Sequence, residues 1–102
     1  MNISVTKEDI RHGQKCNRYK CPIALAAMRS LYRSSANYCV QVGFTPFGTA
    51  SEIAVWCDDR WHSVLLPKNV HRFMATFDRG GKVKPFDFDL EIPDVLDCWK
   101  WK

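Results

Sequence analysis

The chain has 102 residues, of which 46% are hydrophobic and 25% are charged. This composition is close to the globular average, so it excludes a fully disordered chain and supplies enough apolar surface for a core. We expect residues 1–102 to form a single compact domain, because the length suits one domain and not two. No window approaches the roughly 20 apolar residues of a transmembrane helix, and the first residues lack the apolar segment of a secretory signal. These features predict a cytoplasmic protein without membrane contact.

The formal net charge of +4 is unevenly distributed along the chain. Residues 1–35 contain seven Lys and Arg against two acidic residues, residues 36–81 contain four against four, and residues 82–102 contain four against five. A basic segment of this kind can contact nucleic acid or an acidic protein surface, and it can equally be a solvated face. Charge alone leaves these alternatives open.

The cysteines argue against a secreted, disulfide-rich class of protein. There are five of them, at positions 16, 21, 39, 57 and 98, so they cannot all pair within one chain. In a reducing cytosol we expect Cys39, Cys57 and Cys98 to be small buried hydrophobic residues.

The first predicted elements are a short strand and a short helix. Ile3 and Val5 alternate with polar neighbours, which is typical of a strand. Thr6 and Asp9 then have the spacing of a capping arrangement for a helix over residues 7–12.

Gly13 is expected to end this helix, and residues 14–20 form a basic loop without any period. Pro22 suits the first turn of a helix, where its missing N–H is not needed, so a helix is predicted over residues 22–33. Residues 38–42 alternate as a strand.

Residues 44–51 have the composition of a loop, and two phenylalanines in it, Phe44 and Phe47, exceed what packing requires. Residues 52–57 and 61–66 are rich in strand-forming residues and predict a hairpin.

Pro67 opens a helix that Gly80 and Gly81 close. Its buried face follows the spacing i, i+3, i+4 and i+7 and consists of Val70, Phe73, Met74 and Phe77. Residues 86–92 alternate apolar and acidic side chains, which predicts a half-buried strand. The element order therefore predicts an α+β fold, in which a small antiparallel sheet of about four to five strands is covered on one face by two helices. Residues 94–102 form a short aromatic tail.

The sharpest metal candidate is a group of three residues around the basic loop. His12, Cys16 and Cys21 could supply three zinc ligands, but the spacing between the cysteines is loose and no second close pair follows. We therefore expect neither a bound metal nor another cofactor. Cys21 precedes a helix, a position that lowers the pKa of a thiol, but no pattern supplies an oriented histidine base. The sequence thus favours a protein without enzymatic activity.

Candidate residues for contact with a partner protein or nucleic acid are basic or aromatic. Those in the first third of the chain are Lys15, Arg18, Tyr19, Lys20, Arg29 and Arg33. Phe44 and Phe47 join them from the predicted loop. Trp99 and Trp101 lie in the tail, where we expect them to form an interface, either a homodimer or the partner surface, or Trp99 to fold back onto the core.

Several short motifs resemble a family of short uncharacterised proteins encoded by bacteriophages and prophages. The motifs are Val5 to Ile10, Gly13, Cys21 to Ala26, Leu66-Pro67, Phe73, Phe77-Asp78, and Val83, Pro85, Phe86 and Phe88. The resemblance implies the cytoplasm of a bacterial host as the setting and supplies no mechanism.

Taken with the missing catalytic pattern, this setting favours a non-enzymatic accessory protein that binds and blocks a host protein complex. A bacterial defence system such as a CRISPR effector is the expected target. One alternative is a small nucleic-acid-binding module that uses the basic first third of the chain, and another is an oligomer that binds a nucleotide signal.

Overall fold

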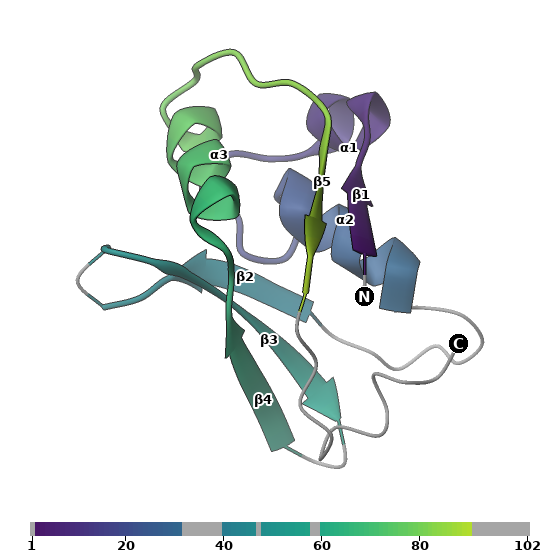
Figure 1. The fold of residues 1–102 in the computed structure, drawn as a ribbon, viewed down its shortest axis with the longest axis vertical. Coiled ribbons are helices and arrows are strands. Elements are labelled where there is room, and N and C mark those ends of the chain that lie inside the picture. The colour runs from purple at the N-terminus through teal and green to yellow at the C-terminus, as the bar shows by residue number, and fades with distance from the viewer. Residues whose placement is uncertain (1, 32–39, 47, 58–59, 91–102) are drawn as a thin grey trace.

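The computed structural model describes residues 2–31, 40–46, 48–57 and 60–90. Within these ranges the chain has an α+β fold, as predicted (Figure 1). The helices are α1 (Lys7–His12), α2 (Pro22–Leu31) and α3 (Lys68–Asp78). The strands are β1 (Asn2–Val5), β2 (Val40–Phe44), β3 (Ser51–Cys57), β4 (Arg60–Leu65) and β5 (Phe86–Asp89).

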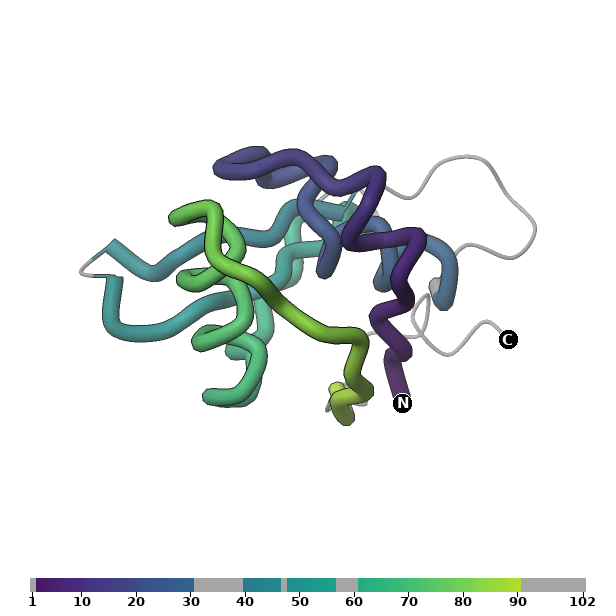
Figure 2. The backbone as a smooth tube through the Cα atoms, turned by 90° about the horizontal axis from the view of Figure 1, so that it is seen from above, coloured from purple at the N-terminus to yellow at the C-terminus, as the bar shows by residue number. Residues whose placement is uncertain are grey.

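The strands divide between two antiparallel sheets, where the sequence predicted one. Strands β2, β3 and β4 pair in this order. The predicted hairpin is the β3–β4 pair, in which Trp56 lies opposite Trp61. Strand β1 pairs with β5 instead, with Val5 opposite Phe86. Figures 1 and 2 show β1 and β5 side by side. The alternating pattern of a strand shows which of its faces is buried but not which strand it pairs with. The division into two sheets could therefore not be predicted from the sequence.

Helix α1 begins with the predicted capping box. Asp9 donates its backbone N–H to Thr6 Oγ1 at 3.2 Å, and the Asp9 carboxylate accepts the Thr6 N–H at 2.8 Å. The helix ends at Gly13, whose N–H donates to the Asp9 carbonyl at 2.8 Å. Gly13 has a φ of −69°, so its role is not a left-handed turn. A Cβ atom there would lie 2.6 Å from the Pro22 ring, so glycine permits the close approach of this segment to the start of α2.

Helix α3 buries the predicted face, since Val70, Phe73, Met74 and Phe77 are all buried. It ends in a Schellman motif, in which the Gly80 N–H donates to the Phe77 carbonyl at 2.9 Å and the Gly81 N–H donates to the Thr76 carbonyl at 2.9 Å. Gly80 has a φ of +82°, the left-handed conformation that glycine adopts without strain. The two glycines therefore end the helix as expected.

Strands β2 and β5 differ from the predicted ranges. Strand β2 begins at Val40 and includes Phe44, which pairs with Ser51 and was expected in a loop. Strand β5 ends at Asp89 and is followed by the buried Leu90. The remaining predicted strand residues, 38–39 and 91–92, lie outside the described residues, as do residues 32–33 of the predicted second helix.

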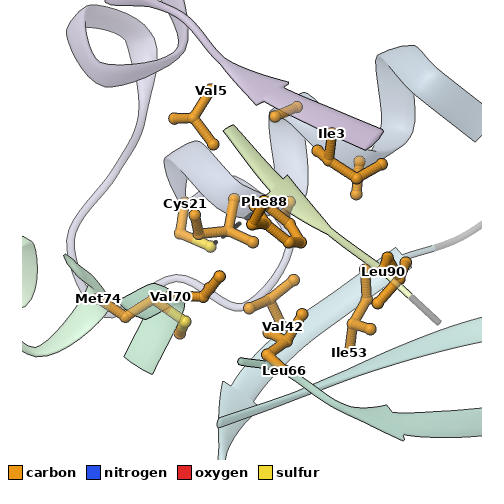
Figure 3. Packing of buried hydrophobic residues seen from close by; sticks show 14 of the residues in the cluster. Ile3, Val5, Cys21, Val42, Ile53, Leu66, Val70, Met74, Phe88 and Leu90 are labelled. Atoms are coloured by element: carbon orange, nitrogen blue, oxygen red, sulfur yellow. Dashed lines mark hydrogen bonds between the residues drawn. The ribbon is translucent and has the colours of Figure 1, made fainter. Parts of the chain in front are cut away.

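One hydrophobic cluster joins the two sheets with α2 and α3. Ile3 of β1 and Phe88 of β5 point into the same core as Val42 and Ile53 of the three-stranded sheet (Figure 3). The small residues of α2 let it pack closely here, because Ala24, Ala26 and Ala27 have no exposed surface. The helices and the β1–β5 pair thus leave the opposite face of the three-stranded sheet for other contacts (Figure 1).

Candidate functional site

The basic loop over residues 14–20 is closed by its own backbone. The Gln14 N–H donates to the Lys20 carbonyl at 2.8 Å, and the Cys21 N–H donates to the Asn17 carbonyl at 3.0 Å. The Asn17 side-chain oxygen accepts the backbone N–H groups of Tyr19 and Lys20 at 3.0 Å each. Such asparagine turns hold a loop in one shape without secondary structure.

Two long-range hydrogen bonds fix the loop against the rest of the fold. The Arg18 carbonyl accepts the Val42 N–H at 2.8 Å, so the loop covers the edge of β2. The Cys16 N–H donates to Asp78 Oδ1 at 3.0 Å and ties the loop to the end of α3. Lys15 lies at the same helix end, because a Cβ atom on Gly80 would be 3.1 Å from Lys15 Nζ. A cation stabilises the negative end of a helix dipole there.

A cavity of about 210 Å³ lies beneath the basic loop. Its lining residues are Cys16, Asn17, Arg18, Cys21, Val42, Gly43, Phe44, Met74 and Asp78. The structure therefore brings together Arg18 and Phe44, two of the predicted partner residues. Tyr19 and Lys20 are exposed on the same loop, with 46% of the Tyr19 surface open to solvent.

The three metal candidates do not form a common site. Among the described residues, no three His, Cys, Asp or Glu side chains lie close enough together to hold a metal ion. Cys21 is buried, and its sulfur accepts the Ala24 N–H at 3.4 Å, so it caps α2. Burial raises the pKa of the Cys21 thiol, which reverses the lowering expected from its place before a helix. His12 Nδ1 lies 3.1 Å from the Glu8 carbonyl within α1, and Cys16 is exposed.

Arg29, predicted as a partner contact, pairs with the buried Asp9 of α1. Its guanidinium donates to both carboxylate oxygens, to Oδ2 at 2.9 Å, and to the Ser4 carbonyl at 2.7 Å. This bidentate pair joins α2 to α1 and β1. Burial raises the pKa of Asp9, but the hydrogen bonds from Arg29 and Thr6 outweigh it and hold the pKa below its usual value.

Replacement of the Asp9 carboxylate should reduce the dependence of the free energy of unfolding on pH in the acidic range. Because the folded-state pKa is lowered, the contribution of Asp9 is present above its unfolded pKa of about 3.9 and is lost as the pH falls through the folded value. We expect Asp9→Asn to lower the free energy of unfolding by about 1–3 kcal/mol at pH 6 and by less below about pH 3. Urea unfolding over a pH series measures this, with the exposed Glu8→Gln as the control. A constant difference at every pH would contradict the assignment.

The outer face of the three-stranded sheet carries the largest exposed apolar side chains of β3 and β4. The strand register places eight residues on this outer sheet face: Gln41, Gly43, Glu52, Ala54, Trp56, Trp61, Ser63 and Leu65. Trp56 and Trp61 are 37% and 40% exposed, and Leu65 is 64% exposed. The two indole rings meet edge to face, with centroids 5.4 Å apart.

The charge of the outer sheet face is low. It contains one carboxylate, Glu52, and neither Lys nor Arg. Arg18 reaches its edge, where it lines a small depression of about 60 Å³ together with Gln41, Glu52 and Ala54. The basic loop therefore borders an apolar face at the β2 edge.

Comparison with protein-family models, with curated proteins and with solved structures finds no match. The geometry of the described residues is therefore the basis on which a function can be proposed.

A serine–histidine pair was not anticipated from the sequence. Ser51 Oγ lies 2.7 Å from His71 Nδ1, and the Phe44 ring meets the imidazole edge to face at 5.4 Å. Such a pair activates a nucleophile when substrate can reach the serine. Ser51 has no exposed surface, so the pair joins β3 to α3 as a structural hydrogen bond. Twenty residues separate the two partners, and no local pattern links a strand residue to a helix residue at that distance.

The other predicted site residues, Arg33, Phe47, Trp99 and Trp101, lie outside the described residues. The same holds for Cys39, Cys98 and the side chain of Cys57. Within the described part of the chain, no helix has the length and apolar character needed to cross a membrane.

Proposed function

We propose that this protein acts by binding another protein through the outer sheet face. The observation that supports this most is the exposure of Trp56, Trp61 and Leu65 on neighbouring strands of one surface. Clustered apolar side chains on a surface are typical of contact sites, and tryptophan is enriched among the residues that dominate binding energy. Binding of a partner would remove the apolar side chains of this face from water, which favours the complex.

The charge of this face favours a protein partner over nucleic acid. Nucleic-acid affinity depends on Lys and Arg contacts to phosphates, and the outer sheet face has none of its own. The centre of a protein interface, in contrast, is depleted of charge and rich in aromatic residues, while its rim is polar. Arg18 and Glu52 at the β2 edge fit such a rim.

The resemblance to bacteriophage and prophage proteins supports the cytoplasm of a bacterial host as the setting of this binding. The partner we propose there is a host protein complex that is part of a defence system, such as a CRISPR effector, and inhibition would be steric. Binding without catalysis is consistent with the inaccessible Ser51 and with the raised pKa of the buried Cys21 thiol.

The exposed basic loop supports a second candidate function, nucleic-acid binding. Tyr19 stands between Arg18 and Lys20 in a loop held by hydrogen bonds, which is an arrangement that can stack a base between two phosphate contacts. The two functions use different surfaces, so single substitutions separate them.

Leu65→Ser and Trp61→Ala should each weaken capture of the host partner by about tenfold or more, because they remove apolar area from the centre of the proposed interface. Immobilised variants incubated with host extract, followed by quantification of the partner that wild type retains, measure this. Tyr19→Ser is the matched control, since it removes an equally exposed aromatic from the basic loop. Capture that survives both sheet variants but is lost with Tyr19→Ser, and that falls steeply with salt, would instead favour nucleic-acid binding.

A further inference from the structure

A second surface, between α3 and the segment over residues 82–86, forms an open groove of about 380 Å³. One wall is a single face of α3, because Asn69, Arg72 and Thr76 follow a helical spacing. The other wall is the segment over residues 82–86, which leads into the first residue of β5. No described residue lines both this groove and the cavity beneath the basic loop, and none of its described lining residues belongs to the outer sheet face.

Among the described residues, the groove is lined by three exposed cations and by no acidic side chain. Arg72 lies on the helical wall, and Lys82 and Lys84 lie on the opposite wall. None of these three side chains forms an ion pair with any residue of the described chain. Three neighbouring cations in one depression repel one another, and a polyanion bound between the walls offsets this repulsion.

The net charge of residues 68–84, which include the groove, equals the net charge of the whole chain. Residues 68–84 contain five Lys and Arg against one acidic residue, Asp78, and the formal net charge of the chain is +4. The Asp78 carboxylate already accepts the Cys16 N–H, so it faces the basic loop. The charges of residues 36–81, four basic against four acidic, and of residues 82–102, four against five, therefore do not reveal this local excess.

Aromatic rings form the floor of the groove. Phe73 and Phe86 line it, with ring centroids 4.9 Å apart and planes inclined by 39°. Phe73 is buried, whereas Phe86 is only partly buried. An accessible ring next to cations is the combination on which single-stranded nucleic acids bind, with a base against the ring and phosphates at the charges.

We infer that this groove binds single-stranded nucleic acid, with the phosphates along Arg72, Lys82 and Lys84 and a base against Phe86. A duplex would not present its bases to the aromatic floor. The groove is shallow and open rather than enclosed, so it suits a polymer that passes through it better than a small molecule that must be surrounded. This binding is independent of the proposed protein contact on the outer sheet face.

Fluorescence anisotropy of a labelled oligothymidylate tests the inference over salt concentrations of about 50–200 mM. Three phosphate contacts predict a slope of log affinity against log salt of about −2, and Arg72→Gln or Lys84→Gln should each reduce its magnitude by about 0.7. Lys68→Gln is the matched control, because it removes the same charge from α3 outside the groove. It should leave affinity nearly unchanged.

Phe86→Leu separates stacking from charge. We expect it to weaken oligothymidylate binding severalfold with the salt slope unchanged, and thermal denaturation checks that the variant folds. Equal losses with Lys68→Gln and Arg72→Gln would overturn the inference, because general electrostatic attraction would then explain the binding. Polyglutamate that competes as well as the oligonucleotide, without sensitivity to Phe86→Leu, would show a site for acidic protein segments and would overturn it too. Absence of oligonucleotide binding by wild type would also overturn it.

Discussion

Phe77→Ala is expected to lower the free energy of unfolding by about 3–5 kcal/mol, the range for a large core aromatic. Phe77 is 8% exposed and stacks on Phe73, with ring centroids 6.2 Å apart and planes nearly parallel. Phe73 contacts Phe86, and Phe86 lies 5.9 Å from Phe88, so a row of four rings joins α3 to β5. Alanine leaves a cavity at one end of this row, since backbone elements cannot collapse to fill it.

Thermal denaturation followed by circular dichroism measures this loss. For a domain of this size each kcal/mol lowers the midpoint by about 4–8 °C, so a decrease of more than about 10 °C is expected. Phe44→Ala is the control, because Phe44 is 40% exposed at the end of β2 and should cost only about 1 kcal/mol. If the two variants melt alike, the ring row does not hold α3 to β5.

Gly13→Ala is the second substitution with a large expected effect, a loss of about 2–3 kcal/mol from overpacking. The added Cβ would lie 2.6 Å from Pro22 Cδ and Cγ and 2.8 Å from the Asp9 carbonyl. Neither a proline ring nor a helix carbonyl can rotate away, so α1 would have to move relative to α2. The backbone angles of Gly13 suit any residue, so the collision alone accounts for the loss.

Gly43→Ala provides the comparison for this steric argument. A Cβ atom at Gly43 would meet nothing within 4 Å. The substitution should therefore leave stability unchanged or raise it by up to about 1 kcal/mol, because alanine restricts the unfolded chain. Urea unfolding of both variants decides the matter, and a similar loss in both would point to backbone flexibility rather than to contact with Pro22.

The helices were predictable because their signals are local. Thr6 and Asp9 stand three residues apart and close a capping box, and Gly80 follows α3 where a left-handed residue is required. The buried face of α3 follows from spacing alone, since a helix places i, i+3, i+4 and i+7 together. Each of these signals lies within one or two turns of the structure that it specifies.

The arrangement of the sheets was not predictable because it depends on distant pairs. The hairpin between β3 and β4 needs only a short turn, and it was found. The pairing of Val5 with Phe86 spans about 80 residues, and the sequence around either residue does not indicate its partner. The candidate surfaces share this property, since the groove joins Arg72 to Lys84 across a helix end and the outer sheet face depends on register.

The pairing of β1 with β5 also sets the order in which this protein can fold during synthesis. Strand β1 leaves the ribosome before β5, with the apolar Ile3 and Val5 ready to pair, and Phe86 and Phe88 follow about 80 residues later. At about 5–20 residues per second that interval lasts about 4–16 s, longer than most small domains need to fold. During this interval the three-stranded sheet of β2, β3 and β4 can form, but the core still lacks the β1–β5 sheet. A chaperone that binds extended apolar segments would meet β1 throughout this interval and would be displaced only when β5 arrives.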